Sequence, residues 1–271
     1  MTVTYAVPCG GCNRRLGEWK ASMKRVTALL TFAVMVAGCP VTQPQQTPVP
    51  ALRQQTAAGG VKYWIYVPSY HTSDRQWPLV ITLHGTYGWD GSRRQIDEWK
   101  YLAEQTGLIV AAPDLQSAQG ILPVVRSVWF KDLAADDAAI LSLIDDLVER
   151  YQVDPSAVML SGFSAGGYAM YYTGLRHPDR FDMLIGRNCN SDLGILEGAE
   201  ITDAVRKLPV MIFWGKDDLK EIQDQSWRAF RYLRERGCAQ AEHKEILGGH
   251  LRRPELAYRV WRERLPEKYR R

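Results

Sequence analysis

The stretch VMLSGFSAGGYAM, residues 158–170, combines three signals that together decide the fold. An aliphatic run typical of a buried strand leads into Gly162-Phe163-Ser164-Ala165-Gly166, and a segment with helical character follows it. A G-x-S-x-G motif between a strand and a helix is typical of a sharp turn that raises the serine hydroxyl above the edge of a parallel sheet. The serine would also lie at a helix N-terminus, where the helix dipole favours developing negative charge.

Outward from this motif, short aliphatic runs alternate with segments of helical periodicity. The runs predict strands near residues 62–67, 79–83, 108–112, 158–160, 183–185, 210–214 and 243–247. The periodic segments predict helices near residues 96–105, 132–151, 165–176, 220–237 and 255–265. This alternation predicts an α/β fold with a mostly parallel open sheet and helices on both faces. The segment between the strands at 183–185 and 210–214 is too short for a large cap domain.

A serine hydroxyl needs a base to become a nucleophile, and the base needs an acid that orients it. Of the five histidines, His250 follows Gly248-Gly249 just after the last predicted strand, at the sheet edge where such folds present their sites. The strand at 210–214 ends in Gly215-Lys216-Asp217-Asp218, so either Asp217 or Asp218 could be the acid. The order Ser, Asp, His along the chain is the one expected of α/β-hydrolases.

From about residue 61 to residue 265 the chain resembles single-domain esterases of the α/β-hydrolase superfamily, and it is most similar to the polyhydroxybutyrate depolymerase and feruloyl esterase type. The resemblance rests on Leu83-His84-Gly85, Trp129-Phe130, Asp136-Asp137 leading into Val153-Asp154-Pro155, the Ser164 turn, and Gly248-Gly249-His250. It implies a serine esterase that works through an acyl-enzyme, with Ser164 as nucleophile, His250 as base and Asp218 as the favoured acid.

The resemblance also implies an oxyanion hole made by the backbone N–H groups of Thr86 and Ala165, and a structural role for His84 in bracing the first of these loops. We expect Tyr87, Trp89, Trp129 and Tyr168 to lie near Ser164 as candidates for a substrate pocket. The chain departs from the polymer depolymerases because Leu251-Arg252-Arg253, rather than tryptophan-proline, follows the last histidine. This departure weakens the prediction of a polymer substrate.

The first 60 residues are predicted to direct the protein to secretion and to tether it to a membrane. Lys24 and Arg25 precede an uncharged run at 26–38, which is too short to span a bilayer comfortably and is typical of a secretory signal. The ending Val36-Ala37-Gly38-Cys39 resembles the lipobox of bacterial lipoproteins, in which the cysteine is lipidated. We therefore expect a lipid-anchored protein of the bacterial cell envelope, or a secreted one if the lipobox is not used. The natural start is either Met1 or Met23.

The predicted organisation is a signal region at residues 1–39, a linker at 40–60 and a hydrolase domain at 61–271. The linker is rich in proline and glutamine and should stay extended. The composition, 46% hydrophobic and 24% charged, is too apolar for a disordered chain. The net charge of +4 comes from residues 252–271, so there is no chain-wide basic field for nucleic acid.

Two other functions remain open at this level: a serine peptidase of the same fold, and a non-catalytic binding protein displayed on the envelope. We expect no cofactor, no metal, no nucleic-acid partner, and membrane contact only through the lipid anchor. Asp136 and Asp137 are interpreted as charge compensation at the start of the helix at 132–151. Cys189 and Cys238 are expected to be free, buried thiols, because they should lie at opposite edges of the sheet.

Overall fold

The computed structural model describes residues 52–55, 60–118 and 126–270, with side chains described from 60 to 118 and from 132 to 270. The predicted signal region, the lipidation candidate Cys39 and most of the predicted linker lie outside the described residues. Within the described part, no helix is both long enough and apolar enough to cross a bilayer. The same residues contain no group of three or more His, Cys, Asp or Glu side chains arranged to hold a metal ion.

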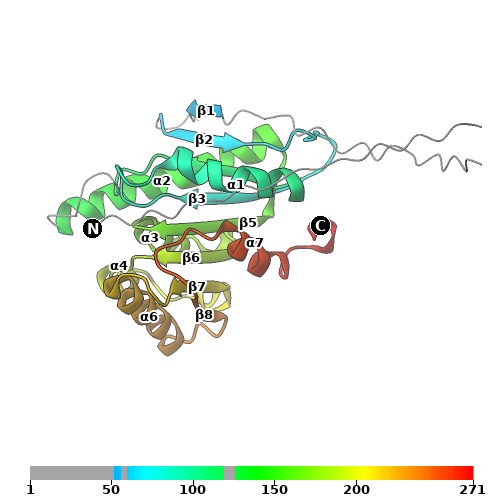
Figure 1. Ribbon diagram of the computed structural model, residues 1–271. Helices are drawn as coiled ribbons and strands as arrows, with labels where there is room; N and C mark the ends of the chain where they lie inside the picture. The colour runs from blue at the N-terminus through cyan, green and yellow to red at the C-terminus, as the bar shows by residue number, and fades with distance from the viewer. Residues whose placement is uncertain (1–51, 56–59, 119–125, 271) are drawn as a thin grey trace, which may run out of the picture. The chain divides into compact units, whose positions relative to one another are not determined.

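An eight-stranded sheet forms the centre of the fold, in the order β1-β2-β4-β3-β5-β6-β7-β8 (Figure 1). The strands from β4 to β8 along this order are parallel, whereas β1 and β2 are antiparallel to their neighbours. Their bounds are β1 Leu52–Gln55, β2 Lys62–Tyr66, β3 Trp77–Leu83, β4 Ile109–Pro113, β5 Val153–Ser164, β6 Met183–Cys189, β7 Val210–Gly215 and β8 Ala241–Ile246. The predicted α/β architecture is confirmed.

Helices cover both faces of this sheet (Figure 1). One core lies between the sheet and α1 and α7, and the other between the sheet and α2 to α6. The helix bounds are α1 Ser92–Thr106, α2 Arg126–Tyr151, α3 Gly166–Arg176, α4 Leu193–Glu197, α5 Asp203–Lys207, α6 Lys220–Glu235 and α7 Pro254–Arg262, with short 3₁₀ turns at Pro178–Arg180 and Glu267–Tyr269. The middle strands are continuously apolar because both of their faces are buried.

Strand β1 differs from the sequence-based expectation. It begins at Leu52, inside the segment predicted to be an extended linker, and pairs antiparallel with β2. An edge strand of this kind is held by backbone hydrogen bonds, so a polar sequence such as LRQQ gives little warning of it. The sheet therefore starts earlier than the boundary expected at Val61.

Helix α2 corrects the interpretation of Asp136 and Asp137. It begins at Arg126, because no glycine or proline interrupts residues 126–151, and Asp136 therefore lies well inside it. The buried Asp136 carboxylate accepts hydrogen bonds from the backbone N–H groups of Gln116 and Ser117, at 2.7 and 3.0 Å. Asp137 contacts His177 instead, with 3.1 Å between Oδ2 and Nε2. Both acids thus hold neighbouring segments, and the prediction of helix-end compensation is wrong.

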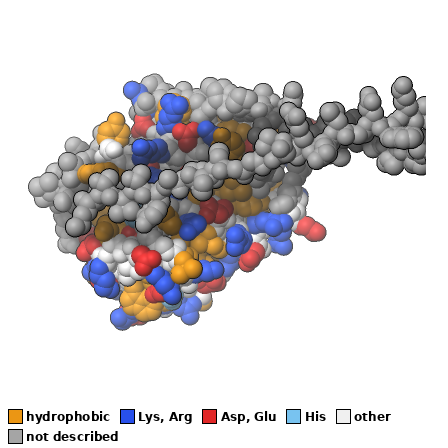
Figure 2. Space-filling model, in the orientation of Figure 1, with side chains coloured by type: hydrophobic (Ala, Val, Ile, Leu, Met, Phe, Trp, Pro, Cys, Tyr) orange, Lys and Arg blue, Asp and Glu red, His pale blue; other side chains and the backbone are white. Residues whose placement is uncertain are grey.

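The two cysteines agree with the prediction, since Cys189 and Cys238 are both free and buried. Burial raises the pKa of the Cys189 thiol to about 12, so the thiol is protonated and unreactive at neutral pH. The described surface on the face seen in Figure 2 carries cationic and anionic side chains interspersed rather than one field of a single sign.

Candidate active site

The turn between β5 and α3 places Ser164 at the carboxyl edge of the sheet. Ser164 has a φ of 50°, a left-handed conformation that non-glycine residues seldom adopt. The turn is tight enough to require glycine on both sides. A Cβ on Gly162 would lie 2.7 Å from the carbonyl oxygen of Gly166, and one on Gly166 would lie 2.5 Å from that of Leu83. The G-x-S-x-G spacing is therefore imposed by backbone contacts, and it leaves the Ser164 side chain partly exposed.

His250 and Asp218 form a hydrogen-bonded pair at the same edge. His250 Nδ1 lies 2.9 and 3.0 Å from the two carboxylate oxygens of Asp218. The Asp218 side chain is fully buried, and its Oδ1 also accepts the backbone N–H of Leu219 at 2.7 Å. With Nδ1 donating to the carboxylate, Nε2 is left to accept a proton.

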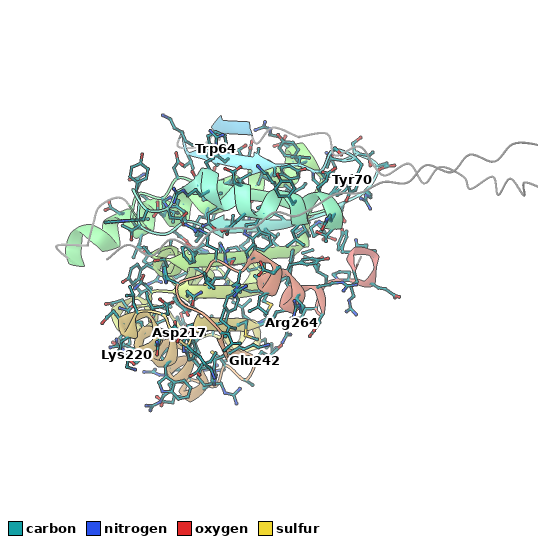
Figure 3. All side chains as sticks on the ribbon, in the orientation of Figure 1. Trp64, Tyr70, Asp217, Lys220, Glu242 and Arg264 are labelled. Atoms are coloured by element: carbon teal, nitrogen blue, oxygen red, sulfur yellow. The ribbon has the colours of Figure 1, made fainter. Side chains whose placement is uncertain are left out.

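The neighbouring Asp217 takes a different position. Its side chain is exposed, at the end of β7 beside the start of α6 (Figure 3), while its backbone N–H donates to the Gly248 carbonyl. Of the two acids that the sequence left open, the structure thus brings Asp218 to His250.

The loop that carries His250 is fixed by contacts with the strands next to Ser164. The His250 ring packs on Phe163, the residue before the serine, with 4.8 Å between ring centroids. Asn188, at the end of β6, accepts the Gly215 N–H at 2.6 Å and donates to the Leu251 carbonyl. The imidazole is thereby held against Phe163, the residue that precedes the serine. Within the described residues no hydrogen bond joins His250 to the Ser164 hydroxyl, as is common in free enzymes of this kind.

The backbone N–H groups of Thr86 and Ala165 are among those near Ser164 that have no hydrogen-bond acceptor among the described residues. The N–H groups on either side of Thr86, in the loop after β3, do have acceptors. Gly85 N–H donates to Asp90 at 2.8 Å and Tyr87 N–H donates to the Ala118 carbonyl at 2.8 Å. This loop touches the serine, since a Cβ on Gly85 would lie 3.0 Å from the Ser164 Cβ. Two free donors at this place suit an oxyanion hole.

His84 braces the same loop. Its Nε2 accepts the backbone N–H of Leu115 at 3.0 Å, so its Nδ1 carries the proton and donates to the Gly85 carbonyl at 2.7 Å. Both ring nitrogens of this buried histidine are therefore engaged, and neither can serve as a base for Ser164. Because a trans peptide directs its C=O and N–H in opposite directions, the bond to the Gly85 carbonyl also aims the Thr86 N–H.

The structure reveals a buried ionic cluster beneath this edge that sequence reasoning missed. It consists of Asp90, Glu98, Arg187 and Arg252, which come from the Thr86 loop, α1, β6 and the loop after His250. Arg187 is fully buried and contacts Glu98 Oε1 at 2.6 Å. Burial raises the pKa of Glu98, and the Arg187 guanidinium opposes that rise. The one signal in the sequence was the arginine itself, which directly follows the apolar run at 183–186.

The candidate pocket residues fall into different environments. Tyr87 and Trp89 are 65% and 63% exposed on the loop around Thr86, so they form an aromatic rim rather than a buried pocket. Tyr168 packs partly buried against the core one turn after Ser164, and burial, with a smaller contribution from the Asp192 carboxylate, raises its pKa to about 12. Trp129 lies in α2, where the structure does not describe its side chain.

A polar hollow of about 170 Å³ lies next to the segment that follows β6. It is lined by Ser191, Asp192, Leu193, Glu221, Gln225 and Arg228. Gln225 connects it to the serine turn, because it accepts from Asn190 Nδ2 at 3.0 Å and the Asn190 N–H donates to the Ser164 carbonyl at 2.9 Å.

The sheet, the serine turn and the His–Asp pair define the class of this protein as the α/β-hydrolase fold. Solved structures support this class at low sequence identity. A ferulic acid esterase matches with a TM-score of 0.57 and 15% identity, covering 82% of this chain and 97% of the other. The esterase PE8 matches with a TM-score of 0.58 and 22% identity, covering 74% and 97%.

Sequence comparison narrows the class to a family. The model of the esterase family matches residues 55–250, and the chain belongs to that family. Curated relatives include a bifunctional acetylxylan esterase/xylanase of Neocallimastix patriciarum, 29% identical over 108 residues, and an iron(III) enterobactin esterase of Dickeya dadantii, 29% identical over 141 residues. The matches cover 40% and 46% of this chain but span only 15% and 28% of these relatives.

Proposed function

We propose that the protein is a serine hydrolase that cleaves carboxylic esters through an acyl-enzyme. The proposal rests above all on the Asp218–His250 pair, in which a fully buried carboxylate fixes the imidazole at the edge where the strained Ser164 turn ends. Membership of the esterase family supports the same reaction class.

In this mechanism Ser164 attacks the ester carbonyl while His250 Nε2 takes the hydroxyl proton, and Asp218 stabilises the imidazolium that forms. The N–H groups of Thr86 and Ala165 donate to the oxygen that becomes negatively charged. His250 then returns the proton to the leaving alcohol. A water molecule, activated by the same imidazole, hydrolyses the acyl-enzyme and frees Ser164.

The test is to incubate the full chain with p-nitrophenyl acetate and, in parallel, with peptide p-nitroanilides. We expect ester turnover with a burst of p-nitrophenol, and labelling of Ser164 by a fluorophosphonate probe located by mass spectrometry. Hydrolysis of the peptides alone would instead indicate a peptidase. Failure of the probe to label Ser164, together with absence of ester turnover, would indicate a binding protein.

The ester class is a further part of the proposal. The chain resembles the polyhydroxybutyrate depolymerase and feruloyl esterase type, and the exposed aromatic pair Tyr87 and Trp89 offers a surface for a flat or ring-shaped group. The polar hollow that Gln225 and Asn190 connect to the serine turn favours substrates with hydroxyl groups over purely aliphatic ones. A panel of feruloyl, acetyl-sugar and hydroxyalkanoate esters, compared by kcat/KM, would rank these classes.

The site of action is proposed from the sequence pattern. The apolar run at 26–38 followed by Cys39 supports a lipid anchor in the bacterial cell envelope, and the proline- and glutamine-rich segment after it supports a tether. Expression of the full chain and of Cys39→Ser in a bacterial host, followed by separation of membrane and soluble fractions, tests this. We expect the substitution to release the protein from the membrane fraction, and equal distribution of the two proteins would contradict the anchor.

A further inference from the structure

Asp90 holds the loop that carries the Thr86 N–H. Its Oδ2 accepts the backbone N–H of Gly85 and the side-chain amide of Gln95, both at 2.8 Å, and its own N–H donates to the Thr86 carbonyl at 3.0 Å. The Asp90 side chain is 3% exposed, so these bonds form away from water. Asp90 is therefore hydrogen-bonded to the peptide groups directly before and directly after the one that carries the Thr86 N–H.

Arg252 connects this loop to the loop that carries His250. Its guanidinium pairs with Asp90 Oδ1 at 3.1 Å and with Glu98 Oε2 at 3.3 Å. The same guanidinium lies over the Phe163 ring at 4.8 Å, and the His250 ring packs against that ring at 4.8 Å. The side chain that follows the histidine by two residues thus reaches the acid of the Thr86 loop.

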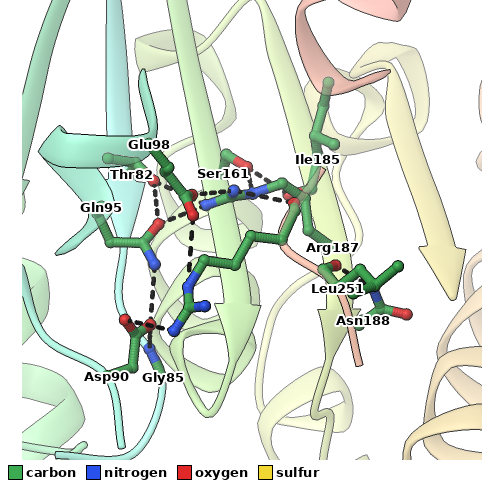
Figure 4. A network of polar contacts seen from close by, with 11 residues as sticks. Thr82, Gly85, Asp90, Gln95, Glu98, Ser161, Ile185, Arg187, Asn188 and Leu251 are labelled. Carbon is green, nitrogen blue, oxygen red and sulfur yellow. Dashed lines mark hydrogen bonds and ion pairs between the residues drawn. The ribbon is translucent and has the colours of Figure 1, made fainter. Parts of the chain in front are cut away.

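Arg187 anchors the Asp90–Arg252 pair to strand β6. Its five N–H groups reach acceptors on five residues: Ser161 Oγ, Glu98 Oε1, the Arg252 carbonyl, Thr82 Oγ1 and Gln95 Oε1. This uses the full donor capacity of a guanidinium. Figure 4 shows Gln95 lying between Arg187 and Asp90, with Gly85 next to Asp90. The network therefore runs without interruption from β6 to the Thr86 loop.

We propose that Asp90 and Arg252 are positioning residues of the reaction, a pair that aims the Thr86 N–H at the developing oxyanion and keeps this loop in register with the His250 loop. The inference rests on the proposed ester hydrolysis and adds residues that the Ser–His–Asp set does not include. Neither side chain touches the reacting atoms.

The physical reason is that an oxyanion donor must be preorganised to be useful. A hydrogen bond to the developing charge is lost when the donor is misplaced by about 1 Å, which costs about 100-fold in rate. Gly85 has no side chain to hold its peptide groups in place, so the direction of the Thr86 N–H depends on the bonds made by Asp90 and His84. The ion pair with Arg252 holds Asp90 Oδ1 and leaves Oδ2 turned toward the Gly85 N–H.

The test compares Asp90→Asn, Arg252→Gln and the double variant with the wild-type full chain, using p-nitrophenyl acetate. We expect each single variant to lower kcat at least about tenfold, below the limit of about 10²–10³-fold for complete removal of one oxyanion donor. KM should change far less than kcat, because the ground-state ester makes little use of the hole. Affinity for a trifluoromethyl ketone that forms the tetrahedral adduct should fall in parallel with kcat.

Three comparisons separate positioning from simple loss of stability. The double variant should be no slower than the slower single variant, since both changes break one unit. Arg252→Lys should restore only part of kcat, because an ammonium cannot bridge both acids as a guanidinium does. The control Asp154→Asn removes a buried acid of the same kind, paired with Lys268 at 3.0 Å, and should leave kcat unchanged.

The outcomes are distinguishable. Wild-type kcat retained in both single variants would overturn the positioning role, as would independent multiplication of their effects in the double variant. A fall in kcat for Asp154→Asn equal to that for Asp90→Asn would also overturn it, because the effect would then follow stability. Absence of ester hydrolysis by the wild-type chain would overturn the proposed function and this inference together.

Discussion

Two ionic clusters, each built around a buried carboxylate, lie at opposite ends of β5. At its carboxyl end, below Ser164, Asp90 and Glu98 meet Arg187 and Arg252. At its amino end, the Asp154 carboxylate accepts hydrogen bonds from Lys268 Nζ at 3.0 Å and the Tyr269 hydroxyl at 2.8 Å, and from Ser156.

The chemistry of the two clusters is similar, but what they hold is different. The first cluster binds together a helix, three strands and two loops, and the loops carry the Thr86 N–H and His250. The second fastens the C-terminal 3₁₀ turn to the start of one strand. The comparison teaches that the role of a buried ion pair depends on which backbone groups it holds. It predicts that substitutions in the first cluster change activity, whereas substitutions in the second change stability and leave activity unchanged.

The largest effect should come from Ser164→Ala, which removes the nucleophile and leaves both clusters intact. We expect kcat for p-nitrophenyl acetate to fall by about 10⁶-fold, toward what binding and the oxyanion hole alone provide. The urea midpoint of unfolding should stay close to that of the wild type. Residual activity within about 100-fold of wild type, measured at substrate saturation, would contradict the nucleophile assignment.

The next largest effect should come from Asp218→Asn. The amide can donate to Nδ1 and so favour the wrong tautomer, in which Nε2 carries the proton and cannot receive one from Ser164. We expect kcat to fall about 10⁴-fold with the fold retained. Steady-state kinetics with circular dichroism as the folding check would measure this, and a loss smaller than about tenfold would argue against Asp218 as the orienting acid.

Arg187→Met tests the catalytic-side cluster as a structural element. Removing the guanidinium leaves Glu98 buried without its closest partner, and we expect the free energy of unfolding to fall by about 3–5 kcal/mol at pH 7. Burial already raises the pKa of Glu98, so the folded state binds its proton more readily than the unfolded state. Stability of the variant should therefore be regained as pH falls and lost as pH rises. Urea unfolding at pH 7 and pH 5 would show this.

A second substitution provides the control for that result. Adding Glu98→Gln to Arg187→Met removes the unpaired carboxylate, so the double variant should recover part of the lost stability and lose the pH dependence between pH 5 and pH 7. Equal stability of the single and double variants at pH 7 would show that the buried charge is not the cause of the loss.

The strands could be predicted because they obey local rules, and the same rules led to the candidate site residues. Strands that are buried on both faces have aliphatic sequences. The Ser164 turn needs glycine at fixed positions to avoid backbone collisions. His250 was marked by the two glycines before it and by its place after the last strand. The family resemblance favoured Asp218 over Asp217, whereas the spacing alone left both open, because two adjacent acids differ only in which way the turn directs them. The structure brings Asp218 to His250.

The ionic cluster could not be predicted, since its members come from four separate segments of the chain. Asp90 and Arg252, taken singly, read as ordinary surface charges in loops. Arg187 made the predicted strand end at residue 185, whereas β6 continues to Cys189 with the arginine side chain buried within it. Asp136 was misread for a related reason, because its partners belong to a loop twenty residues away.

Asp154→Asn tests the other cluster. Burial opposes ionisation of Asp154, but hydrogen bonds from Ser156, Tyr269 and Lys268 together lower its pKa to about 2. The ionised carboxylate therefore stabilises the fold at pH values above its unfolded pKa near 4, and this contribution is lost as pH falls toward 2. We expect the variant to lose about 1–3 kcal/mol at pH 7, with a smaller difference from wild type at pH 3 and unchanged kcat.

The smallest effect should come from Asp217→Asn, the matched partner of Asp218→Asn. The two acids are adjacent in one turn, but the Asp217 side chain is exposed and only its backbone N–H, which the substitution keeps, binds the Gly248 carbonyl. We expect kcat and KM within about twofold of wild type and a change in unfolding free energy below about 0.5 kcal/mol. A large loss of kcat in Asp217→Asn would show that Asp217, and not Asp218, is the acid that orients His250. Since a fault in the turn would affect both variants, the roughly 10⁴-fold contrast between them isolates the carboxylate that faces His250.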